Sequence, residues 1–221
     1  MNEIIIEECT KEKLEKGCIL SAIAHAIAVA KYPEISYEYS WDGINYNIQN
    51  GEGTRGTITF AKDKCVAAFR NENSERMDEN ISYLEYFESA PTNVLKLAES
   101  ETLQYLLENV NGNPQPVITT AFWGDKVIKS VDKVDIFLEN GGDIISAEFM
   151  EMKKAIEWWK SEYDFSEEEQ KMLLDVYERK ISNHEKTIHL TKDEINLIKK
   201  YSDEGYKESY ASFQELNIRA E

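Results

Sequence analysis

The amino-acid sequence predicts an α+β fold, in which an antiparallel β-sheet carries a buried N-terminal helix on one face and is followed by a helical C-terminal part. Three observations support this fold class. The stretch from Leu14 to Ala30 is apolar on nearly all sides, the region from Ile35 to about Asn71 begins with alternating aromatic and polar residues, and the sequence from Ser146 onward has helical periodicity.

The apolar stretch predicts a buried helix from about Lys11 to Lys31. Ala, Ile and Leu dominate it from Leu14 onward, and Lys31-Tyr32-Pro33 ends it. A helix with apolar residues on all sides belongs in a core, so we expect it to pack against the sheet.

The alternating region predicts a four-strand antiparallel meander. The segment ISYEYSWDGINYNIQ surrounds Asp42-Gly43, a hairpin turn signal, and TITF and CVAAFR follow as two more strands. VITTAFW, which ends at Trp123, predicts a further strand.

Several helices are expected after the meander. The segment NVLKLAESETLQYLLENVNGNPQP predicts one that ends at Asn111-Gly112, and Ser130 is expected to cap another. Ser166 with Glu169 and Thr191 with Glu194 form capping boxes in the C-terminal part. We therefore expect a mixed α+β domain at residues 1–143 and a helical part at 144–221, which could also pack as one domain with the first.

The chain of 221 residues is strongly acidic. Its 42 acidic and 25 basic residues give a formal net charge of −17 and a pI near 4.7. Nucleic acids and anionic membranes are disfavoured as partners, because binding to them depends on Lys and Arg. A basic protein is the favoured partner, although the charge could serve only solubility.

The N-terminal sequence and the cysteines favour a cytoplasmic protein. MNEIIIEECT is acidic where a secretory signal would be basic, and the longest apolar run is too short to span a bilayer. The three cysteines are an odd number, which indicates reduced thiols.

The stretch NGEGTRGTITF contains Gly51, Gly53 and Gly56 in the G-x-G-x-x-G spacing of a nucleotide-binding loop. A dinucleotide loop is followed by a helix, but TITF here predicts a strand. A protein-kinase loop requires a downstream lysine where Phe69 stands, together with H-R-D and D-F-G motifs that the sequence lacks. We therefore expect a glycine-rich hairpin that binds no nucleotide, with Arg55 beside a neighbouring carboxylate.

The combination of YSWDGINYNIQ with GTRGTITF and VAAF resembles a bacterial protein family that has no assigned role. The similarity covers about a fifth of the chain. It implies a bacterial, cytosolic protein, and it supplies no functional residue.

No catalytic, cofactor-binding or metal-binding residue is predicted. Cys18 and His25 are seven residues apart on one helix, roughly 10 Å along its axis, so they cannot form a catalytic pair. His25 is expected to be a core histidine bonded to a backbone carbonyl. His184 and His189 lack the spacing of one helical face, and zinc, calcium and Ser-hydrolase motifs are missing from the sequence.

We therefore expect a non-catalytic, cytosolic protein whose acidic surface binds a basic protein, as immunity proteins against bacterial toxins do. The alternative is a hydrolase-type enzyme whose acid and base carboxylates cannot be chosen among 42 acids. Trp158 and Trp159 are neighbours on a predicted helix, so one is expected in the core and the other near the surface. The candidate partner-binding residues are Glu167, Glu168, Glu169, Asp203, Glu204, Glu208 and Trp158.

Overall fold

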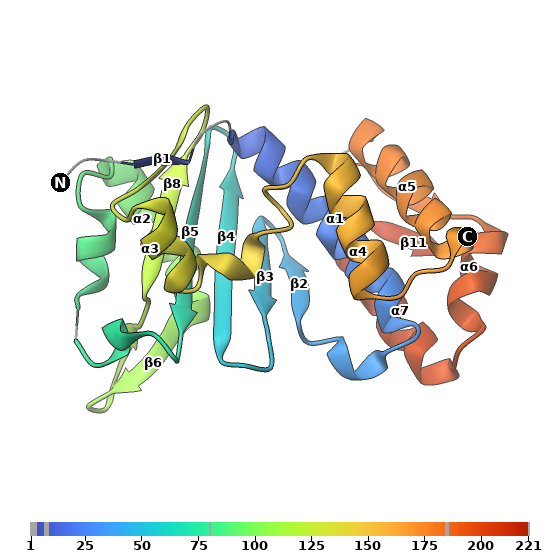
Figure 1. The fold of residues 1–221 in the computed structure, drawn as a ribbon, viewed down its shortest axis with the longest axis horizontal. Coiled ribbons are helices and arrows are strands. Elements are labelled where there is room, and N and C mark those ends of the chain that lie inside the picture. The colour runs from blue at the N-terminus through green and yellow to red at the C-terminus, as the bar shows by residue number, and fades with distance from the viewer. Residues whose placement is uncertain (1–3, 7–8, 80, 184–185, 221) are drawn as a thin grey trace. The chain divides into compact units, whose positions relative to one another are not determined.

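The computed structural model describes residues 4–6, 9–79, 81–183 and 186–220. It confirms the α+β class: the described residues form seven α-helices and an antiparallel sheet, with an N-terminal helix before the sheet and a helical C-terminal part (Figure 1). The chain divides into two compact units. The first comprises Met1–Leu14 and Ile44–Ser146, and the second comprises Glu15–Gly43 and Ala147–Glu221.

The first unit is built on six of the described strands, which neighbour one another in the order β1-β9-β8-β5-β4-β3. Each pair of neighbours runs antiparallel, and β4 pairs with β5 along its whole length from Thr54↔Asn71 to Ala61↔Lys64. The strands are β1 (Ile4–Ile6), β3 (Asn45–Gln49), β4 (Thr54–Ala61), β5 (Lys64–Asn71), β8 (Thr120–Gly124) and β9 (Ile128–Ser130), and the α-helices of this unit are α2 (Thr92–Ser100) and α3 (Val134–Glu139).

Apolar side chains line both faces of this sheet, since successive residues of a strand point to opposite faces. On one face, Val66 and Trp123 share a buried cluster with residues of α2 and of the 3-10 helices Tyr83–Phe87 and Thr102–Leu106. On the other face, the ring of Phe137 in α3 lies 5.6 Å from that of Phe69 and 5.9 Å from that of Phe122. The sheet is therefore a buried central layer of the first unit.

The second unit is mostly helical. It contains all of α1 (Lys11–Val29) after its first four residues, together with α4 (Met152–Glu162), α5 (Glu167–Ser182), α6 (Lys192–Lys199), α7 (Asp203–Glu215), the 3-10 helix Pro33–Ile35 and the strands β2 (Tyr39–Asp42), β10 (Ile188–Leu190) and β11 (Ile218–Ala220).

Helix α1 is buried on every side from Cys18 to Ala30, as the apolar sequence predicts. Its backbone meets α7 directly, because the hydroxyl of Ser209 donates a hydrogen bond of 2.6 Å to the carbonyl oxygen of Ala26. A Cβ atom at Gly205 would lie 2.1 Å from the carbonyl oxygen of Ala30. Small residues of α7 therefore allow this close approach to α1.

Both predicted capping boxes are confirmed. Ser166 accepts from the backbone N–H of Glu169 at the start of α5, and Thr191 accepts from that of Glu194 at the start of α6. Each glutamate in turn accepts from the backbone N–H of its capping residue. These local bonds satisfy backbone donors that a helix start would otherwise expose.

The prediction of one helix that continues to Asn111 is wrong for the second half of the segment. Helix α2 ends at Ser100, and the chain then forms a hairpin of β6 (Leu107–Val110) and β7 (Asn113–Pro116). Asn111 and Gly112 have φ angles of 54° and 86°. Both are positive, as a two-residue hairpin turn requires, so this dipeptide connects strands instead of ending a helix.

The helix cap expected at Ser130 is also wrong. Ser130 is the last residue of β9, and its hydroxyl donates to the carbonyl of Ala121 while accepting from the backbone N–H of Asp132. The following helix begins at Val134, with Lys133 as the flanking residue. The hydroxyl thus stabilises the end of the strand and not the helix.

The C-terminal part is not helical throughout, because β10 and β11 pair in parallel from Ile188↔Ile218 to Leu190↔Ala220. Strands of three residues are too short to produce a readable alternation. Within the described residues, every helix falls short of the combined length and apolarity that crossing a bilayer demands.

Candidate functional site

The three predicted glutamates at the start of α5 have three different environments. Glu167 is exposed, and its carboxylate lies 2.7 Å from the ammonium of Lys160. Glu168 is exposed and lines a groove between α5 and α6. Glu169 is only 2% exposed and accepts hydrogen bonds from Ser166 and from the hydroxyl of Tyr201. Glu168 is therefore available to a partner, and Glu169 belongs to the interior.

The pKa of Glu169 reflects this interior role. Burial alone would raise the pKa of this carboxyl, but the hydrogen bonds from Tyr201 and Ser166 outweigh it and the pKa is lowered. The charged form is thus the one that the fold holds in place.

The predicted acids of α7 are at its surface. Ser202 caps the helix by accepting from the backbone N–H of Gly205, and Asp203 and Glu204 follow in the first turn. Both are exposed, as is Glu208 one turn later. These acids lie on a different helix from Glu168, and they do not line its groove.

The two neighbouring tryptophans of α4 separate as predicted. Trp159 is 3% exposed and stacks on Tyr163 with a ring distance of 5.3 Å, whereas Trp158 is 46% exposed. Trp158 is therefore a large apolar side chain at the surface of the second unit.

A groove with a volume of about 720 Å³ lies between α5 and α6. The side chains on the α5 wall fall at positions i, i+3, i+4, i+7 and i+11, which is one face of a helix. We refer to it as the α5–α6 groove. Its lining residues are Glu168, Lys171, Met172, Asp175, Arg179, Thr191, Asp193, Glu194, Asn196, Leu197 and Lys200.

Four of the charged side chains in this groove form two ion pairs, and within each pair the opposite charges neutralise each other. The Nη2 atom of Arg179 lies 3.0 and 2.7 Å from the two carboxylate oxygens of Glu194, which connects α5 to α6. Lys171 pairs with Asp175 one turn along α5. Glu168 and Asp193 have no ion-pair partner among the described residues, so they are the unneutralised acids of the groove. Sequence reasoning missed Asp193, although its place beside the Thr191 cap predicts an acid at a helix start.

The net charge itself is not concentrated in either unit. The first unit contains 20 acidic and 11 basic residues, a net charge of −9, and the second contains 22 acidic and 14 basic residues, a net charge of −8. Any acidic binding surface must therefore come from the local arrangement of charges and not from one unit being more acidic.

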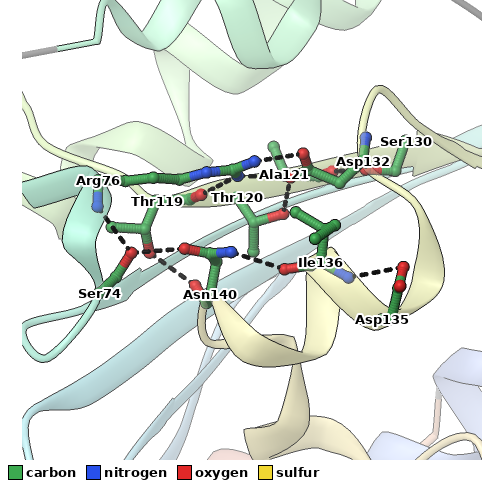
Figure 2. A network of polar contacts seen from close by, with 10 residues as sticks. All are labelled: Ser74, Arg76, Thr119, Thr120, Ala121, Ser130, Asp132, Asp135, Ile136 and Asn140. Carbon is green, nitrogen blue, oxygen red and sulfur yellow. Dashed lines mark hydrogen bonds and ion pairs between the residues drawn. The ribbon is translucent and has the colours of Figure 1, made fainter. Parts of the chain in front are cut away.

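The first unit contains a buried polar network centred on Arg76 and Asp132 (Figure 2). The guanidinium of Arg76 donates two hydrogen bonds to the carboxylate of Asp132, at 2.8 and 2.7 Å, and a third to the carbonyl of Thr119 at 2.7 Å. The hydroxyl of Thr120 donates to the same carboxylate at 2.6 Å. Hydrogen bonding to Asp132 raises the pKa of Arg76.

A second branch of this network holds the end of α3. Ser74 accepts from the backbone N–H of Arg76 and donates to the side chain of Asn140, and the hydroxyl of Thr119 donates to the carbonyl of Asn140. Figure 2 shows these side chains directed at one another between the sheet and α3. Because the charges are paired within the protein, we interpret the network as a stabilising connection between the sheet and the end of α3, and not as a reactive site.

The second unit contains a buried titratable cluster around His25. Its ring lies 4.6 Å from that of Tyr39 and 6.5 Å from that of Tyr163. Nε2 lies 2.9 Å from the carbonyl oxygen of Ile35, so His25 is the backbone-bonded core histidine that the sequence predicts. Burial raises the pKa values of both tyrosines, and the nearby charges of Glu148 and Glu38 add to the effect.

The cavity beside this cluster is too small for a substrate. It is lined by His25, Tyr39 and Glu215 among others, and its volume is about 10 Å³, the space of one water molecule. Burial raises the pKa of Glu215, and burial together with the charge of Glu162 raises that of Glu38. Carboxylates with raised pKa values are thus present, but they do not line the large groove.

The glycine-rich segment forms a hairpin, as predicted. Gln49 pairs with Arg55 across it, and Gly53 has a φ angle of 94°. Gly56 is within β4, where a Cβ atom would lie 2.2 Å from the ring of Phe69. The guanidinium of Arg55 lies 3.0 Å from the carboxylate of Glu72, as expected for a structural arginine.

The three thiols are shielded from solvent. Cys9, Cys18 and Cys65 are all buried, and burial raises the pKa of Cys9 to about 11. His184 lies outside the described residues. Within the described ranges, no group of three or more His, Cys, Asp or Glu side chains is arranged to hold a metal ion.

Comparison of the chain with protein-family models, with curated proteins and with solved structures finds no match.

Proposed function

We propose that this chain is a non-catalytic, cytosolic interaction protein that binds a basic protein partner through acidic side chains of its helical unit. Immunity proteins against bacterial toxins are one class with this mode of action. The analogy rests on charge and size alone.

The observation that carries the proposal is a set of exposed acids at three consecutive helix starts in one unit. Glu168 in α5, Asp193 in α6, and Asp203 and Glu204 in α7 have no ion-pair partner among the described residues. Unneutralised acids accelerate encounter with a basic surface, and salt screens the effect over about 8 Å at physiological ionic strength.

A purely structural role makes a different prediction. Acids in the first turn of a helix stabilise its macrodipole by about 0.3–1 kcal/mol each. Neutralising them would then lower stability slightly and leave association unchanged. Association kinetics therefore separate the two roles.

The test compares a tagged wild-type chain with two quadruple variants in a pull-down from the source cell at low and high salt. We expect the wild type to retain a basic protein at low salt. Surface plasmon resonance with that protein should give an association rate about five- to tenfold lower for the helical variant, with little change in dissociation. The helical variant is Glu168→Gln, Asp193→Asn, Asp203→Asn and Glu204→Gln, and the first-unit control is Glu52→Gln, Glu75→Gln, Asp78→Asn and Glu88→Gln.

Two other outcomes would count against the proposed function or its site. If neither salt condition retains a basic protein, the interaction function is wrong and the hydrolase alternative takes its place. If only the control variant slows association, a basic partner exists but the chosen residues of the helical unit do not bind it.

A further inference from the structure

We infer that the α5–α6 groove is the docking site for one amphipathic helical segment of the basic partner. This inference rests on the proposed function and assigns it a definite site. Three properties of the groove support it, namely its length, its apolar floor and its remaining unpaired polar groups.

The groove has the dimensions of a helix-binding site. Its α5 wall runs from Glu168 to Arg179, which is twelve residues or roughly 16 Å of helix. That length accommodates about three turns of a partner helix. A volume of about 720 Å³ holds the side chains of one face of such a helix.

The floor and walls combine apolar and charged groups. Leu197, which is partly exposed, and Met172, which is 3% exposed, contribute the apolar part of the lining. Charged residues of both helices surround them. An apolar strip flanked by charges is the pattern of a groove that receives one face of an amphipathic helix.

The unpaired groups specify the charge of the occupant. The pairs Arg179–Glu194 and Lys171–Asp175 leave Glu168 on α5 and Asp193 on α6 as unneutralised acids. Among the described lining residues, Lys200 is the one lysine outside these pairs, so the two acids exceed the unpaired cations by one charge. The remaining excess is negative, which favours lysine or arginine side chains on the occupant.

The test uses a synthetic probe, a fluorescent helical peptide of about fourteen residues with a central leucine strip and lysines toward both ends. Fluorescence anisotropy measures its Kd at low salt for the wild type and for two double variants of equal charge change. Glu168→Gln with Asp193→Asn alters the groove, and Glu75→Gln with Asp78→Asn alters two exposed acids of the first unit.

We expect the groove variant to raise Kd about five- to tenfold and the first-unit variant to leave it within about twofold. Leu197→Ser should also weaken binding, because it removes apolar floor at a partly exposed position without burying a charge. A companion peptide with glutamates in place of the lysines should not bind. Circular dichroism verifies that each variant is folded.

The inference is overturned if the wild type does not bind the lysine peptide, or if both double variants bind it as the wild type does. In the second case the peptide binds elsewhere on the acidic surface, and the proposed function is not affected. Failure of the proposed function itself is detected separately, by the absence of a basic protein in the pull-down.

Discussion

The imidazole Nε2 of His25 lies 2.9 Å from the carbonyl oxygen of Ile35, inside the second unit, and the His25 ring is 1% exposed. The neutral ring can donate this bond, since a carbonyl oxygen only accepts. Burial lowers the pKa of His25 from 6.5 to about 4, with a smaller opposing effect from the bond to Ile35. The folded state therefore disfavours the charged imidazolium.

This shift predicts that stability falls as the pH drops from about 6.5 to about 4. As the pH falls, the unfolded chain takes up the proton first, because its histidine has the higher pKa. The stability contributed by neutral His25 is therefore complete above pH 6.5 and is lost as the pH falls toward about 4. Between pH 7 and pH 5 the loss from His25 should be about 2 kcal/mol. Urea unfolding at the two pH values measures it.

The control for this prediction is His25→Gln, which can donate to Ile35 but does not titrate. The variant should be less stable than the wild type at pH 7, and the gap should narrow by about 2 kcal/mol at pH 5. An identical loss in both proteins would show that other groups cause the pH dependence.

Truncating the buried face of α1 should destabilise the protein strongly. Ile23 and Ile27 are 0% and 1% exposed, so Ile23→Ala or Ile27→Ala should each cost about 2–5 kcal/mol. Val127→Ala, at an exposed position, is the control and should change the free energy of unfolding by less than about 0.5 kcal/mol. Urea unfolding that finds the two isoleucine variants as stable as this control would contradict the burial of α1.

Strong local signals made much of the fold predictable. The continuous apolar run of α1, the alternation around Gly43 and the two capping boxes each specify one structure, because a helix or a strand is the element that buries that pattern. The prediction of a helix end at Asn111-Gly112 is wrong because the same dipeptide suits a helix end and a hairpin turn. Tertiary pairing decides between the two.

The candidate site was less predictable than the fold. Glu167, Glu168 and Glu169 are equivalent by sequence, and only the packing of α5 on its neighbours separates an ion pair, a groove wall and a buried acceptor. The pairing of Arg179 with Glu194 joins two helices, and periodicity within a single helix cannot reveal it. To predict a surface that is built from several helices, one must know how those helices are placed relative to one another.

Breaking the buried ion pair of the first unit should cost more than breaking an exposed one. Arg76→Ala leaves the nearly buried carboxylate of Asp132 without its cationic partner, and we expect a loss of about 3 kcal/mol. The double variant Arg76→Met with Asp132→Leu should recover part of that loss. Lys171→Ala, in an exposed pair, is the control and should cost at most about 0.5 kcal/mol. Equal losses for Arg76→Ala and Lys171→Ala in urea unfolding would mean that the network adds no stability.

The glycine-rich hairpin is predicted not to bind nucleotides, because its third glycine is committed to packing within β4. Millimolar ATP, GTP or NAD with Mg²⁺ should therefore leave the melting temperature unchanged. A site filled at 100 times its Kd would add about 2.7 kcal/mol, which thermal melting detects easily. Gly56→Ala, in contrast, should lower stability by about 1–3 kcal/mol through its clash with Phe69. A reproducible rise with any nucleotide, abolished by Gly53→Asp, would reverse this assignment.

The adjacent residues Glu168 and Glu169 provide a matched pair for the last prediction. Glu169→Gln keeps the size of the side chain but removes the charge that accepts from Ser166 and Tyr201 in the interior, so it should cost about 1.5–3 kcal/mol. Glu168→Gln, one residue earlier and exposed, should change stability by less than about 0.5 kcal/mol. Since hydrogen bonding lowers the pKa of Glu169, its contribution should be complete above the ordinary glutamate range and should fall as the pH drops below it. Urea unfolding at neutral pH compares the two variants directly. If Glu168→Gln is the more destabilising change, Glu168 contributes to the fold, and its use as a partner-binding side chain loses its support.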